Sequence, residues 1–461
     1  MSKALENVTK LNDMVSVTDF GAVGDGVTDD TAAFQNALDY ANTKPGWVEV
    51  VVPPSTSGSE YIFTSLKVYT KTIFKGAGGV LKLKSGTVTG TGSFYPIHNL
   101  GEADVIYDGL IVDGNQANNN AFTPTVCDTI TCVGDRSQVI NCNLTNAVDS
   151  GIMFSSAKDG RCQNNYIDGA PDLCIYINDS TGSTQDNAII SGNICKNGKS
   201  GGGIGVKRYA ANLVISDNTI ADCGNGITVE DFGGGVYPTN LQIVNNSLNG
   251  IGYTQRASAP AERGISISAS DNFIVANNRI RNCSGQILYF GTVTKGVVSG
   301  NHVIGYTASP AASNVGLYVV TATDCTFSGN NISGVQHQGV YSFTPTKCVY
   351  ANNIVYSTGN GMRFNAATSD CIATGNIVSA TSGTDFEIYT GAKLLQRDNI
   401  SMGQSSDSLT RVGWRSVSGA QPLPNAGTLT PFYVGEYVIH LGANTLWQAF
   451  GEGAAEYKQL A

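Results

Sequence analysis

The chain has 461 residues, 55 glycines, only 14% charged side chains and a net charge of −9. Nucleic-acid binding requires a basic surface, so this composition excludes a nucleic-acid partner, and its many Gly and Asn residues are typical of an all-β chain with frequent turns. No apolar run approaches the roughly 18 residues that cross a membrane, and the first 19 residues contain no apolar core of a secretory signal.

Residues 1–46 are predicted to form a leader and a capping helix. Apolar side chains recur at helical spacing over residues 31–41. Asp29 and Asp30 precede them, where acidic residues cap a helix and interact favourably with its dipole. Because the open ends of a strand stack invite aggregation, we expect this helix to act as a lid. Strands are predicted at residues 47–52 and 72–74.

One internal repeat dominates residues 47–402. A Gly-Ile-x-Ile strand recurs about every 22–23 residues, with longer insertions in three repeats. Its first apolar residue gives a ladder: Ile152, Ile175, Ile204, Ile227, Ile265, Ile287, Leu317, Val340 and Met362. Alternate positions in each strand are apolar, as expected when one face is buried. Several short strands per repeat and no helix predict an all-β fold, a right-handed parallel β-helix of about ten coils.

A second ladder is made of asparagines at the turn of each coil: Asn193, Asn218, Asn246, Asn278, Asn301, Asn330, Asn353, Asn376 and Asn399. Asparagine tolerates left-handed backbone, and stacked amides can hydrogen-bond to one another. The column would satisfy backbone groups that a bend leaves unpaired. We therefore expect it to be structural.

Two carboxylates are predicted to stack on neighbouring coils. Asp149 and Asp172 lie three residues before a ladder isoleucine, in an outward column that also includes Glu262, and Tyr176 points outward beside them. Neighbouring coils are about 5 Å apart at the backbone, so repulsion should raise one pKa. This spacing is that of a retaining glycosidase pair. The alternatives are two turn-capping carboxylates or a bound cation between them.

A second cluster lies three residues after the ladder. Lys207 and Glu230 share this outward column, with Arg208 and Asp231 beside them and the longest insertion directly afterwards. We expect Glu230 and Asp231 to be the catalytic pair, because a neighbouring cation lowers one pKa while mutual repulsion raises the other. The alternative is a surface salt bridge worth under about 1 kcal/mol. About 20 Å of extended strand separates this cluster from Asp149.

Farther along the chain, Tyr318 and Tyr341 are predicted to stack outward, with Arg363 next in the column. A tyrosine has an apolar face and a polar tip, which suits packing against a sugar ring. A plain ladder of contacts between coils is the alternative. Asp113, in the segment IVDGN, is interpreted as a turn residue.

No cofactor and no metal site are predicted. The eleven cysteines are scattered without a CxxC pair, so we expect small buried thiols instead of metal ligands or a disulfide framework. No compact set of carboxylates resembles a calcium loop. None of the four histidines lies near the candidate carboxylates in sequence.

The C-terminal part departs from the repeat. Residues 403–431 are rich in Ser, Gly and Pro and are predicted to be a linker, and residues 432–461 are predicted to form a small β module. A module below roughly 40 residues seldom has a sufficient core of its own. We expect it to dock on the solenoid or on another subunit, and the chain to assemble as a homotrimer.

The segment VTDFGAVGDGVTDDTAAFQNAL, Val17–Leu38, resembles the opening of the pectate-lyase-like β-helix superfamily, which includes polygalacturonases, polysaccharide lyases and bacteriophage tailspikes. The leader LENVTKLNDMVSV and the final module resemble parts of phage tail proteins. This resemblance implies a homotrimeric tailspike on the virion that acts at the host cell surface. The chain departs from polygalacturonases in lacking an Asp-Asp pair followed by Gly-His-Gly.

The function expected from these features is a depolymerase that binds and hydrolyses a bacterial surface polysaccharide with an Asp/Glu pair. A lyase acting on a uronate-containing glycan is the closest alternative, and it would use Lys207, Arg208 or a tyrosine as the base. A glycan-binding adhesin without catalytic activity is the alternative from a different class.

Overall fold

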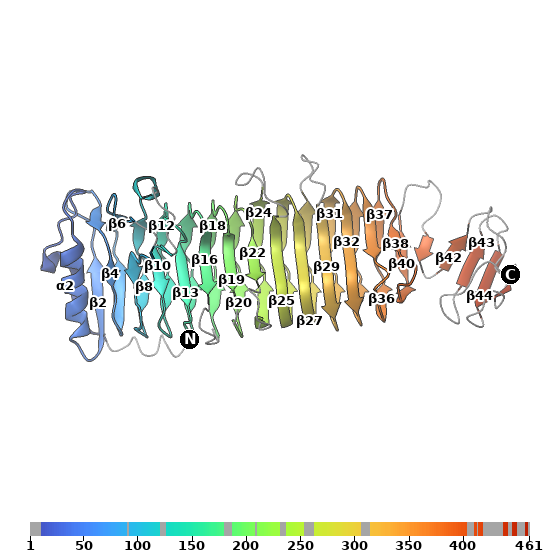
Figure 1. Cartoon of the computed structure of the whole chain (residues 1–461), viewed down its shortest axis with the longest axis horizontal. Coiled ribbons are helices and arrows are strands. Elements are labelled where there is room, and N and C mark those ends of the chain that lie inside the picture. Colours follow the sequence, from blue (N-terminus) through green and yellow to red (C-terminus); the bar gives the residue numbers. More distant parts are fainter. Residues whose placement is uncertain are drawn as a thin grey trace.

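The computed structural model shows a long stack of parallel β-coils with a helix at one end (Figure 1). The described residues are 11–89, 92–119, 126–178, 187–207, 210–230, 237–252, 262–305, 314–402, 410–412, 414–417, 437–440, 445–449 and 457–459. The fold is the predicted right-handed parallel β-helix. No helix in these ranges is long and apolar enough to span a membrane.

Each coil contributes strands to three parallel rows, which we call the ladder row, the middle row and the third row in their order along the coil. The ladder row contains β4 (Leu66–Lys67), β7 (Ile97–His98), β10 (Ile130–Cys132), β13 (Ile152–Ser155), β16 (Leu173–Asn178), β19 (Gly202–Lys207), β22 (Ile227–Glu230), β29 (Val315–Thr323), β32 (Gln338–Thr346), β35 (Asn360–Phe364) and β38 (Phe386–Ile388). Two longer strands, β25 (Arg263–Ala276) and β27 (Gln286–Ser299), run through both the ladder row and the middle row.

The middle row contains β1 (Leu11–Ser16), β2 (Trp47–Val52), β5 (Thr72–Gly76), β8 (Ile106–Asp108), β11 (Gln138–Ile140), β14 (Arg161–Gln163), β17 (Ile189–Ser191), β20 (Val214–Ser216), β23 (Thr239–Val244), β30 (Thr326–Ser328), β33 (Val349–Ala351), β36 (Cys371–Thr374) and β39 (Leu394–Arg397). The third row contains β3 (Tyr61–Phe63), β6 (Val80–Leu83), β9 (Ile111–Asp113), β12 (Asn143–Thr145), β15 (Tyr166–Asp168), β18 (Ile194–Lys196), β21 (Thr219–Ala221), β24 (Ser247–Ile251), β26 (Arg279–Cys283), β28 (His302–Gly305), β31 (Asn331–Val335), β34 (Ile354–Ser357), β37 (Ile377–Ala380) and β40 (Asn399–Ser401). Short 3-10 helices occur at η1 (Val17–Phe20) and η2 (Gln116–Asn118).

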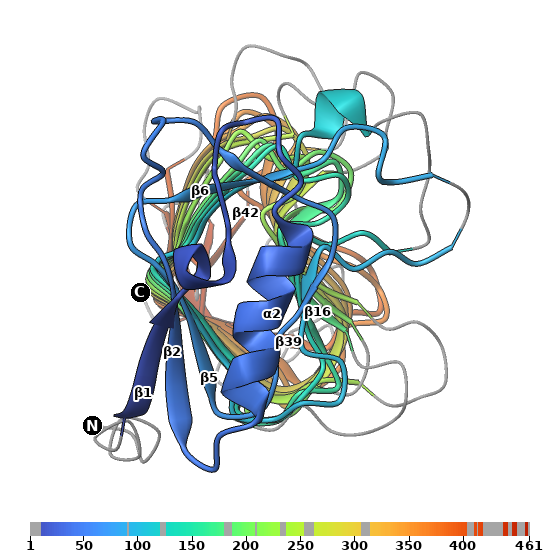
Figure 2. The same cartoon turned by 90° about the vertical axis from the view of Figure 1, so that its left-hand side faces the viewer.

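The helix α2 (Thr31–Asn42) lies across the open end of the first coil, as the sequence predicts (Figure 2). Its buried face consists of Phe34, Ala37, Leu38 and Ala41. The Phe34 ring packs edge-on against Tyr61 and Phe74, with ring centroids 5.4 and 6.2 Å apart. The helix therefore covers the end of the core with its apolar face.

The two aspartates before α2 play different parts. The Asp29 carboxylate accepts from the backbone N–H of Thr31 at 3.1 Å and so supports the first turn. Asp30 occupies the N-cap position, but its side chain makes no capping hydrogen bond. It accepts instead from the backbone N–H groups of Val23 and Gly24, at 2.7 and 3.1 Å. Asp30 therefore fixes the preceding glycine-rich loop against the helix.

The predicted ladder is the buried inner column of the ladder row. Four of its members pair in register on successive strands: Ile152, Ile175, Ile204 and Ile227. One member was predicted wrongly, because Ile265 pairs with Leu288 and not with Ile287. In most coils a glycine directly precedes the ladder residue, whereas here Ile287 occupies that position, so the first apolar residue of the strand is not the ladder residue. Tyr289 consequently faces outward.

The asparagine ladder is continuous, and it begins one coil earlier than predicted, at Asn165. Each side-chain amide donates to the side-chain oxygen of the asparagine in the next coil, at 2.8–3.0 Å. That oxygen also accepts from the backbone N–H of the preceding asparagine. The column thus satisfies the backbone at one bend of every coil, which confirms its structural role. The eleven cysteines are free and buried, as predicted.

The C-terminal part contains a second, small sheet. It is formed by β42 (Trp414–Val417), β43 (Tyr437–His440), β44 (Thr445–Ala449) and β45 (Tyr457–Gln459). β42 pairs with β43 in parallel, and the remaining pairs are antiparallel. Another strand, β41 (Thr410–Val412), pairs antiparallel with β40. Within the segment 403–431 predicted as a linker, residues 410–412 and 414–417 therefore form strands.

Candidate functional site

The outward face of the ladder row carries most of the predicted site residues. The residue after each ladder residue points outward, and we call this set the outer column. Its members pair in register: Met153, Tyr176, Gly205, Thr228, Ser266, Tyr289, Tyr318, Tyr341 and Arg363. The predicted substrate-binding residues Tyr176, Tyr318, Tyr341 and Arg363 therefore share one face of one sheet.

Two of the predicted catalytic aspartates meet at the edge of this row. The Asp172 backbone N–H donates to the carbonyl of Asp149 at 3.3 Å, so the two residues occupy neighbouring coils as predicted. Asp149 Oδ2 accepts from the backbone N–H of Cys127 at 3.4 Å. Asp172 Oδ1 accepts from the Ser200 hydroxyl at 2.9 Å. Both carboxylates are partly exposed, so each remains accessible from solvent.

Asp128 joins this pair, and the sequence analysis missed it. It lies two residues before Ile130, which pairs with Ile152, and its side chain is 1% exposed. Among the described residues, Asp128 Oδ2 has no hydrogen-bond partner. One more step of about 22 residues back from Ile152 identifies Ile130 as a ladder residue. Counting the same number of residues back from Asp149 leads to the position next to Asp128, so the two aspartates are expected to lie on neighbouring coils.

The carboxylates of this acidic cluster (Asp128, Asp149 and Asp172) influence one another's protonation. Burial and the negative charge of Asp172 raise the pKa of Asp149 to about 6. Burial and the negative charge of Asp149 raise the pKa of Asp128 to about 7. Asp149 is the partly exposed member of the two, so it is the group that can both reach a ligand and carry a proton in mildly acidic solution.

The raised pKa of Asp128 predicts a pH-dependent stability. The folded state favours the protonated carboxyl, so this contribution is fully present below about pH 4 and is lost as the pH rises through about 7. A shift of this size corresponds to about 4 kcal/mol. Asp128→Asn should therefore unfold at a higher temperature than the wild type at pH 8 and at nearly the same temperature at pH 4. Thermal denaturation measures both proteins. If the melting temperatures of the variant and the wild type differed by the same amount at pH 4 and at pH 8, this prediction would be wrong.

Lys207 reaches back toward the acidic cluster. It ends β19, yet its ammonium lies 4.8 Å from the centroid of the Tyr176 ring. Its positive charge lowers the pKa of Asp149, against the larger effects of burial and Asp172. The spacing along an extended strand predicted about 20 Å between the two clusters, but the flexible lysine side chain shortens this separation. Lys207 and Tyr176 thus accompany Asp149 and Asp172.

The structure describes only part of the second predicted cluster. Glu230 ends β22 in register with Lys207. Arg208 and Asp231 lie outside the described residues. Glu262 directly precedes β25 and is 9% exposed, and its Oε2 accepts from the Ser284 hydroxyl at 2.6 Å. It therefore does not stand on the surface with Asp149 and Asp172, because a buried turn encloses it.

Tyrosine rings form a continuous stack farther along the outer column. The ring centroids of Tyr318 and Tyr341 are 5.2 Å apart, as expected from the predicted stacking. Tyr289, which the one-residue register error had hidden, extends the stack at 5.7 Å from Tyr318. Two guanidinium groups flank it: Arg363 lies 4.9 Å from the Tyr341 centroid and Arg263 lies 3.5 Å from the Tyr289 centroid.

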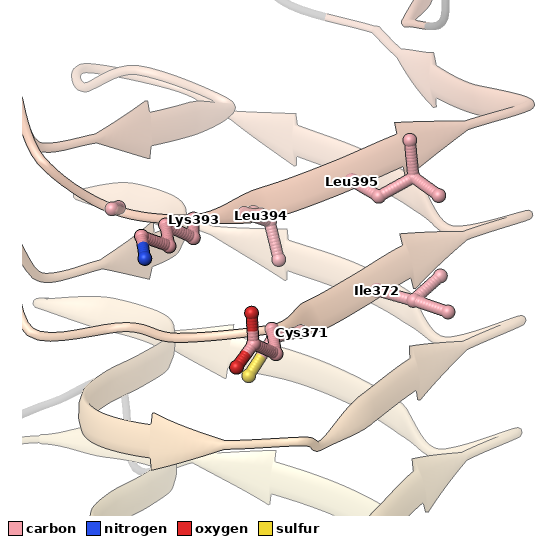
Figure 3. A pocket seen from close by; sticks show the side chains of 7 residues that line it. Cys371, Ile372, Lys393, Leu394 and Leu395 are labelled. Atoms are coloured by element: carbon pink, nitrogen blue, oxygen red, sulfur yellow. The ribbon is translucent and has the colours of Figure 1, made fainter. Parts of the chain in front are cut away.

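A cavity of about 470 Å³ lies away from both features, between β36 and β39 (Figure 3). It is lined by Asp370, Cys371, Ile372, Ala392, Lys393, Leu394 and Leu395. These residues belong to the last coils and to the middle row, so none of the acidic cluster or the outer column contributes to it. We therefore assign this cavity no part in the site.

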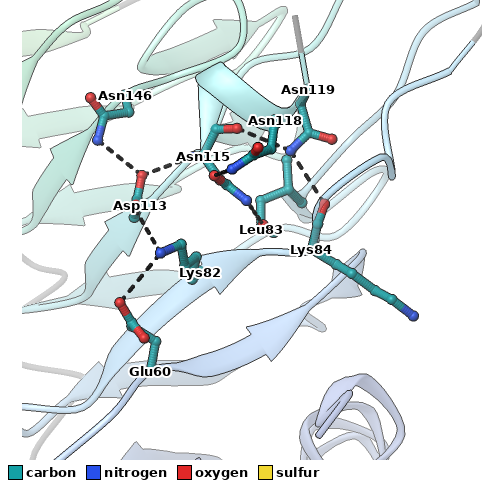
Figure 4. Close-up of polar contacts among 9 residues, drawn as sticks. All are labelled: Glu60, Lys82, Leu83, Lys84, Asp113, Asn115, Asn118, Asn119 and Asn146. Atoms are coloured by element: carbon teal, nitrogen blue, oxygen red, sulfur yellow. Dashed lines mark hydrogen bonds and ion pairs between the residues drawn. The ribbon is translucent and has the colours of Figure 1, made fainter. Parts of the chain in front are cut away.

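Asp113 is the last residue of β9, and its side chain supports the turn that directly follows, close to the role that the sequence indicates (Figure 4). Its Oδ1 accepts from the backbone N–H of Asn115 at 2.8 Å and from the Asn146 amide at 3.0 Å. Lys82 lies 3.8 Å from its Oδ2 and 3.4 Å from Glu60. These partners satisfy the Asp113 carboxylate and leave it a structural role.

One histidine lies closer to the acidic cluster than its sequence position suggested. His98 pairs with Thr131 on the neighbouring strand β10, one strand from the coil of Asp128. Burial and the nearby charge of Lys67 lower the pKa of His98 to about 4. His98 is therefore neutral at physiological pH and adds no positive charge beside the carboxylates.

Comparisons with known proteins agree with this architecture. A family model described as "Rhamnogalacturonase A/epimerase, pectate lyase-like" matches residues 14–252, and one described as "Right handed beta helix region" matches residues 263–418.

Three solved structures share the fold at low sequence identity. The surface adhesin PfbA of Streptococcus pneumoniae has a TM-score of 0.57 and 13% identity, covering 97% of this chain and 98% of that chain. A family 28 exopolygalacturonase of Yersinia enterocolitica has a TM-score of 0.54 and 12% identity, covering 87% and 79%. A tailspike of the E. coli bacteriophage HK620, solved with a pentasaccharide, has a TM-score of 0.54 and 12% identity, covering 84% and 80%. At these identities the likeness is one of fold.

Proposed function

Because the chain belongs to the rhamnogalacturonase A/epimerase, pectate lyase-like family, we propose that it binds and cleaves a bacterial surface polysaccharide, such as a capsule, an exopolysaccharide or an O-antigen. The fold shared with a tailspike and an exopolygalacturonase supports a polysaccharide-active β-helix protein. We place its action outside the cell, at the host surface, as part of a phage tail. The sequence resemblance to phage tail proteins supports that location.

The observation that carries the proposal is a partly exposed pair of neighbouring carboxylates with one raised pKa. Asp149, with a pKa of about 6, is the proton donor, and the neighbouring Asp172 is the nucleophile. This division of roles is the one that glycoside hydrolysis requires. Lys207 and Tyr176 stand beside the pair and can hold the sugar. We prefer this pair to Glu230 and Asp231 because the pKa of Asp149 is raised. Glu230 and Asp231 stay the alternative, and Asp231 lies outside the described residues.

The reaction follows from these two roles. Asp149 gives its proton to the glycosidic oxygen while the Asp172 carboxylate attacks the anomeric carbon, so the carbon–oxygen bond breaks and a glycosyl ester forms. Asp149, now ionised, removes a proton from water, and the resulting attack on the anomeric carbon releases the sugar and restores both carboxyls. A retaining course requires the two carboxyl groups to lie about 5–5.5 Å apart, and two side chains at equivalent positions of neighbouring coils, whose backbones are about 5 Å apart, can meet that requirement.

The direct test is incubation with a panel of purified capsules and lipopolysaccharides, followed by measurement of the glycan's size. Shortened chains with a new reducing end support hydrolysis. An unsaturated product would instead indicate a lyase, with Lys207 as the candidate base. A glycan that binds and keeps its full length would indicate an adhesin, as the similar PfbA protein is.

Activity is expected to survive chelation, because the proposed chemistry uses only protein carboxyls. Incubation with excess EDTA should leave the cleavage rate within about twofold of the untreated enzyme. Complete loss of activity that calcium restores would contradict a purely carboxyl-based reaction, and Asp149 and Asp172 would then be the first candidates for cation ligands.

The chain is expected to assemble as a homotrimer. The middle row presents an outward column in which Gln242 and Thr326 interrupt three apolar groups: Ile189 and Val214, then Ile274 and Val297, then Val349, Ile372 and Leu395. Ile274 and Val297 are neighbours in this column and are 39% and 40% exposed, and exposed apolar side chains that lie together commonly mark an interface. Light scattering should report three chains per particle. A double substitution of Ile274 and Val297 by lysine should reduce that mass.

Asn272→Lys is the matched control, because it adds the same side chain at an exposed position of β25, the strand that carries Ile274. Lys295 already occupies the corresponding position in the next coil, with the same left-handed backbone. This control should leave the mass unchanged. A stable wild-type monomer at micromolar concentration would refute the trimer.

A further inference from the structure

The tyrosine stack on the outer column is a surface distinct from the acidic cluster. Tyr176 lies on β16 and Tyr289 on β27, and β19, β22 and β25 separate these strands. Four steps between strands correspond to about 19 Å along the axis. The outer-column residues between them include Thr228 and Ser266, which are only 7% and 2% exposed. Buried side chains therefore divide the two surfaces.

The tyrosine stack presents aromatic ring faces and is flanked by the positively charged side chains of Arg263 and Arg363. Tyr289, Tyr318 and Tyr341 are partly exposed, and their centroids follow at 5.7 and 5.2 Å. Phe343, 41% exposed, meets Tyr341 edge-on at 6.2 Å. The rings are thus arranged along the axis on successive strands, and an apolar face with a polar rim suits the faces of sugar rings.

The two arginines that flank the stack differ in their charge balance. Arg363 forms an ion pair with Glu387 at 3.4 Å, so its charge is largely compensated. Arg263 donates from Nη1 to the Ser266 hydroxyl at 3.1 Å and lies over the Tyr289 ring. Within the described part of the chain, no carboxylate lies within 4 Å of Arg263, and its Nε has no hydrogen-bond partner.

The charge of Arg263, which pairs with no carboxylate among the described residues, acts along the stack. The positive charge of Arg263 lowers the pKa of Tyr318, although burial and the neighbouring tyrosines raise it overall. A partly exposed guanidinium beside a row of ring faces matches a carboxylate carried on a sugar ring, because guanidinium and carboxylate groups pair with charge-assisted hydrogen bonds. A neutral glycan would leave this charge without a partner.

We propose that Arg263, Tyr289, Tyr318 and Tyr341 form an anchoring site for a carboxylate-bearing polysaccharide, separate from the acidic cluster. The site holds the chain without cleaving it. It goes beyond the proposed hydrolysis and does not depend on it, since the rings and the arginine can bind an acidic glycan whether or not Asp149 acts on it.

The test measures binding and not cleavage. The full-length Asp149→Asn chain is titrated with hyaluronan, alginate and polygalacturonate as carboxylated polymers and with dextran as a neutral one. We expect binding to at least one carboxylated polymer, weakened by added salt, and none to dextran. Equal binding of dextran, or no binding of any carboxylated polymer, would overturn the proposal.

Three variants in that background identify the site. Arg263→Gln and Tyr318→Ala should each weaken binding about tenfold, which corresponds to about 1.4 kcal/mol, and Tyr318→Phe should retain it because the ring remains. Tyr356→Ala is the control, since Tyr356 is 43% exposed but lies on β34 in the third row. Unchanged binding in Arg263→Gln would refute the charge-based assignment even if the Tyr318→Ala chain failed to fold.

The result separates this site from the proposed hydrolase. If the wild type cleaves a glycan but Arg263→Gln binds as tightly as its parent, the anchoring site is wrong and the hydrolase stands. If no glycan is cleaved but binding depends on Arg263 and the tyrosine rings, the anchoring site stands and the hydrolase is wrong.

Discussion

Replacing Asp149 by asparagine is expected to lower kcat for polysaccharide cleavage by about 10²–10⁴-fold, equivalent to about 3–5 kcal/mol of barrier. The asparagine cannot donate the proton that the leaving oxygen requires. It keeps an oxygen that can accept from the backbone N–H of Cys127 and removes the repulsion from Asp172, so the melting temperature should not fall. Asp172→Asn should cause a loss of similar size because it removes the attacking carboxylate.

The pH profile adds an independent readout. Asp149 must be protonated to act, and its pKa is about 6. Activity of the wild type should therefore decline as the pH rises above about 6, approaching tenfold per unit. The residual activity of Asp149→Asn should not show this decline above about pH 6.

Glu230→Gln is the matched control, because it makes the same kind of change on the same face of the ladder row. It should cleave at close to the wild-type rate. If Glu230→Gln is inactive while Asp149→Asn and Asp172→Asn cleave normally, the reaction belongs to the cluster at the end of β22, as the sequence pattern alone suggested, and our assignment is wrong.

Removing one member of the asparagine ladder is expected to cause the largest loss of stability. Asn330 is fully buried, donates to the Val298 carbonyl and to the Asn353 side chain, and accepts from the backbone and the side chain of Asn301. Asn330→Ala leaves two donors and one acceptor unpaired in the interior. Since each of the three costs about 1–3 kcal/mol, the free energy of unfolding should fall by at least about 3 kcal/mol.

Asn331→Ala is the adjacent control for this prediction. Asn331 is exposed, and its side chain makes no hydrogen bond to another described residue. Its replacement should change the free energy of unfolding by no more than about 0.5 kcal/mol. Denaturation followed by circular dichroism measures both variants. Equal losses from Asn330→Ala and Asn331→Ala would show that the buried amide column does not hold the bends together.

Two residues of the site, Tyr289 and Asp128, were not identified from the repeat as it was first aligned. Leu288, and not Ile287, belongs to the ladder, because Ile287 occupies the position where most coils have a glycine. The first apolar residue of this strand is therefore not the ladder residue, and this departure hid Tyr289. Asp128 follows from a regular step of 22 residues from Ile152 back to Ile130, so extending the ladder by one coil toward the N-terminus would identify it.

The sequence by itself determined the fold, the capping helix and the asparagine ladder, because each follows from a periodicity that is visible in the amino-acid sequence. It also paired Asp149 with Asp172, since a fixed coil length puts equivalent positions side by side. Only the tertiary structure decided which carboxyl has the raised pKa, because burial and neighbouring charges set it. The approach of Lys207 to Asp149 was likewise decided there, since it depends on the path of a flexible side chain over Tyr176 and not on spacing along the strand.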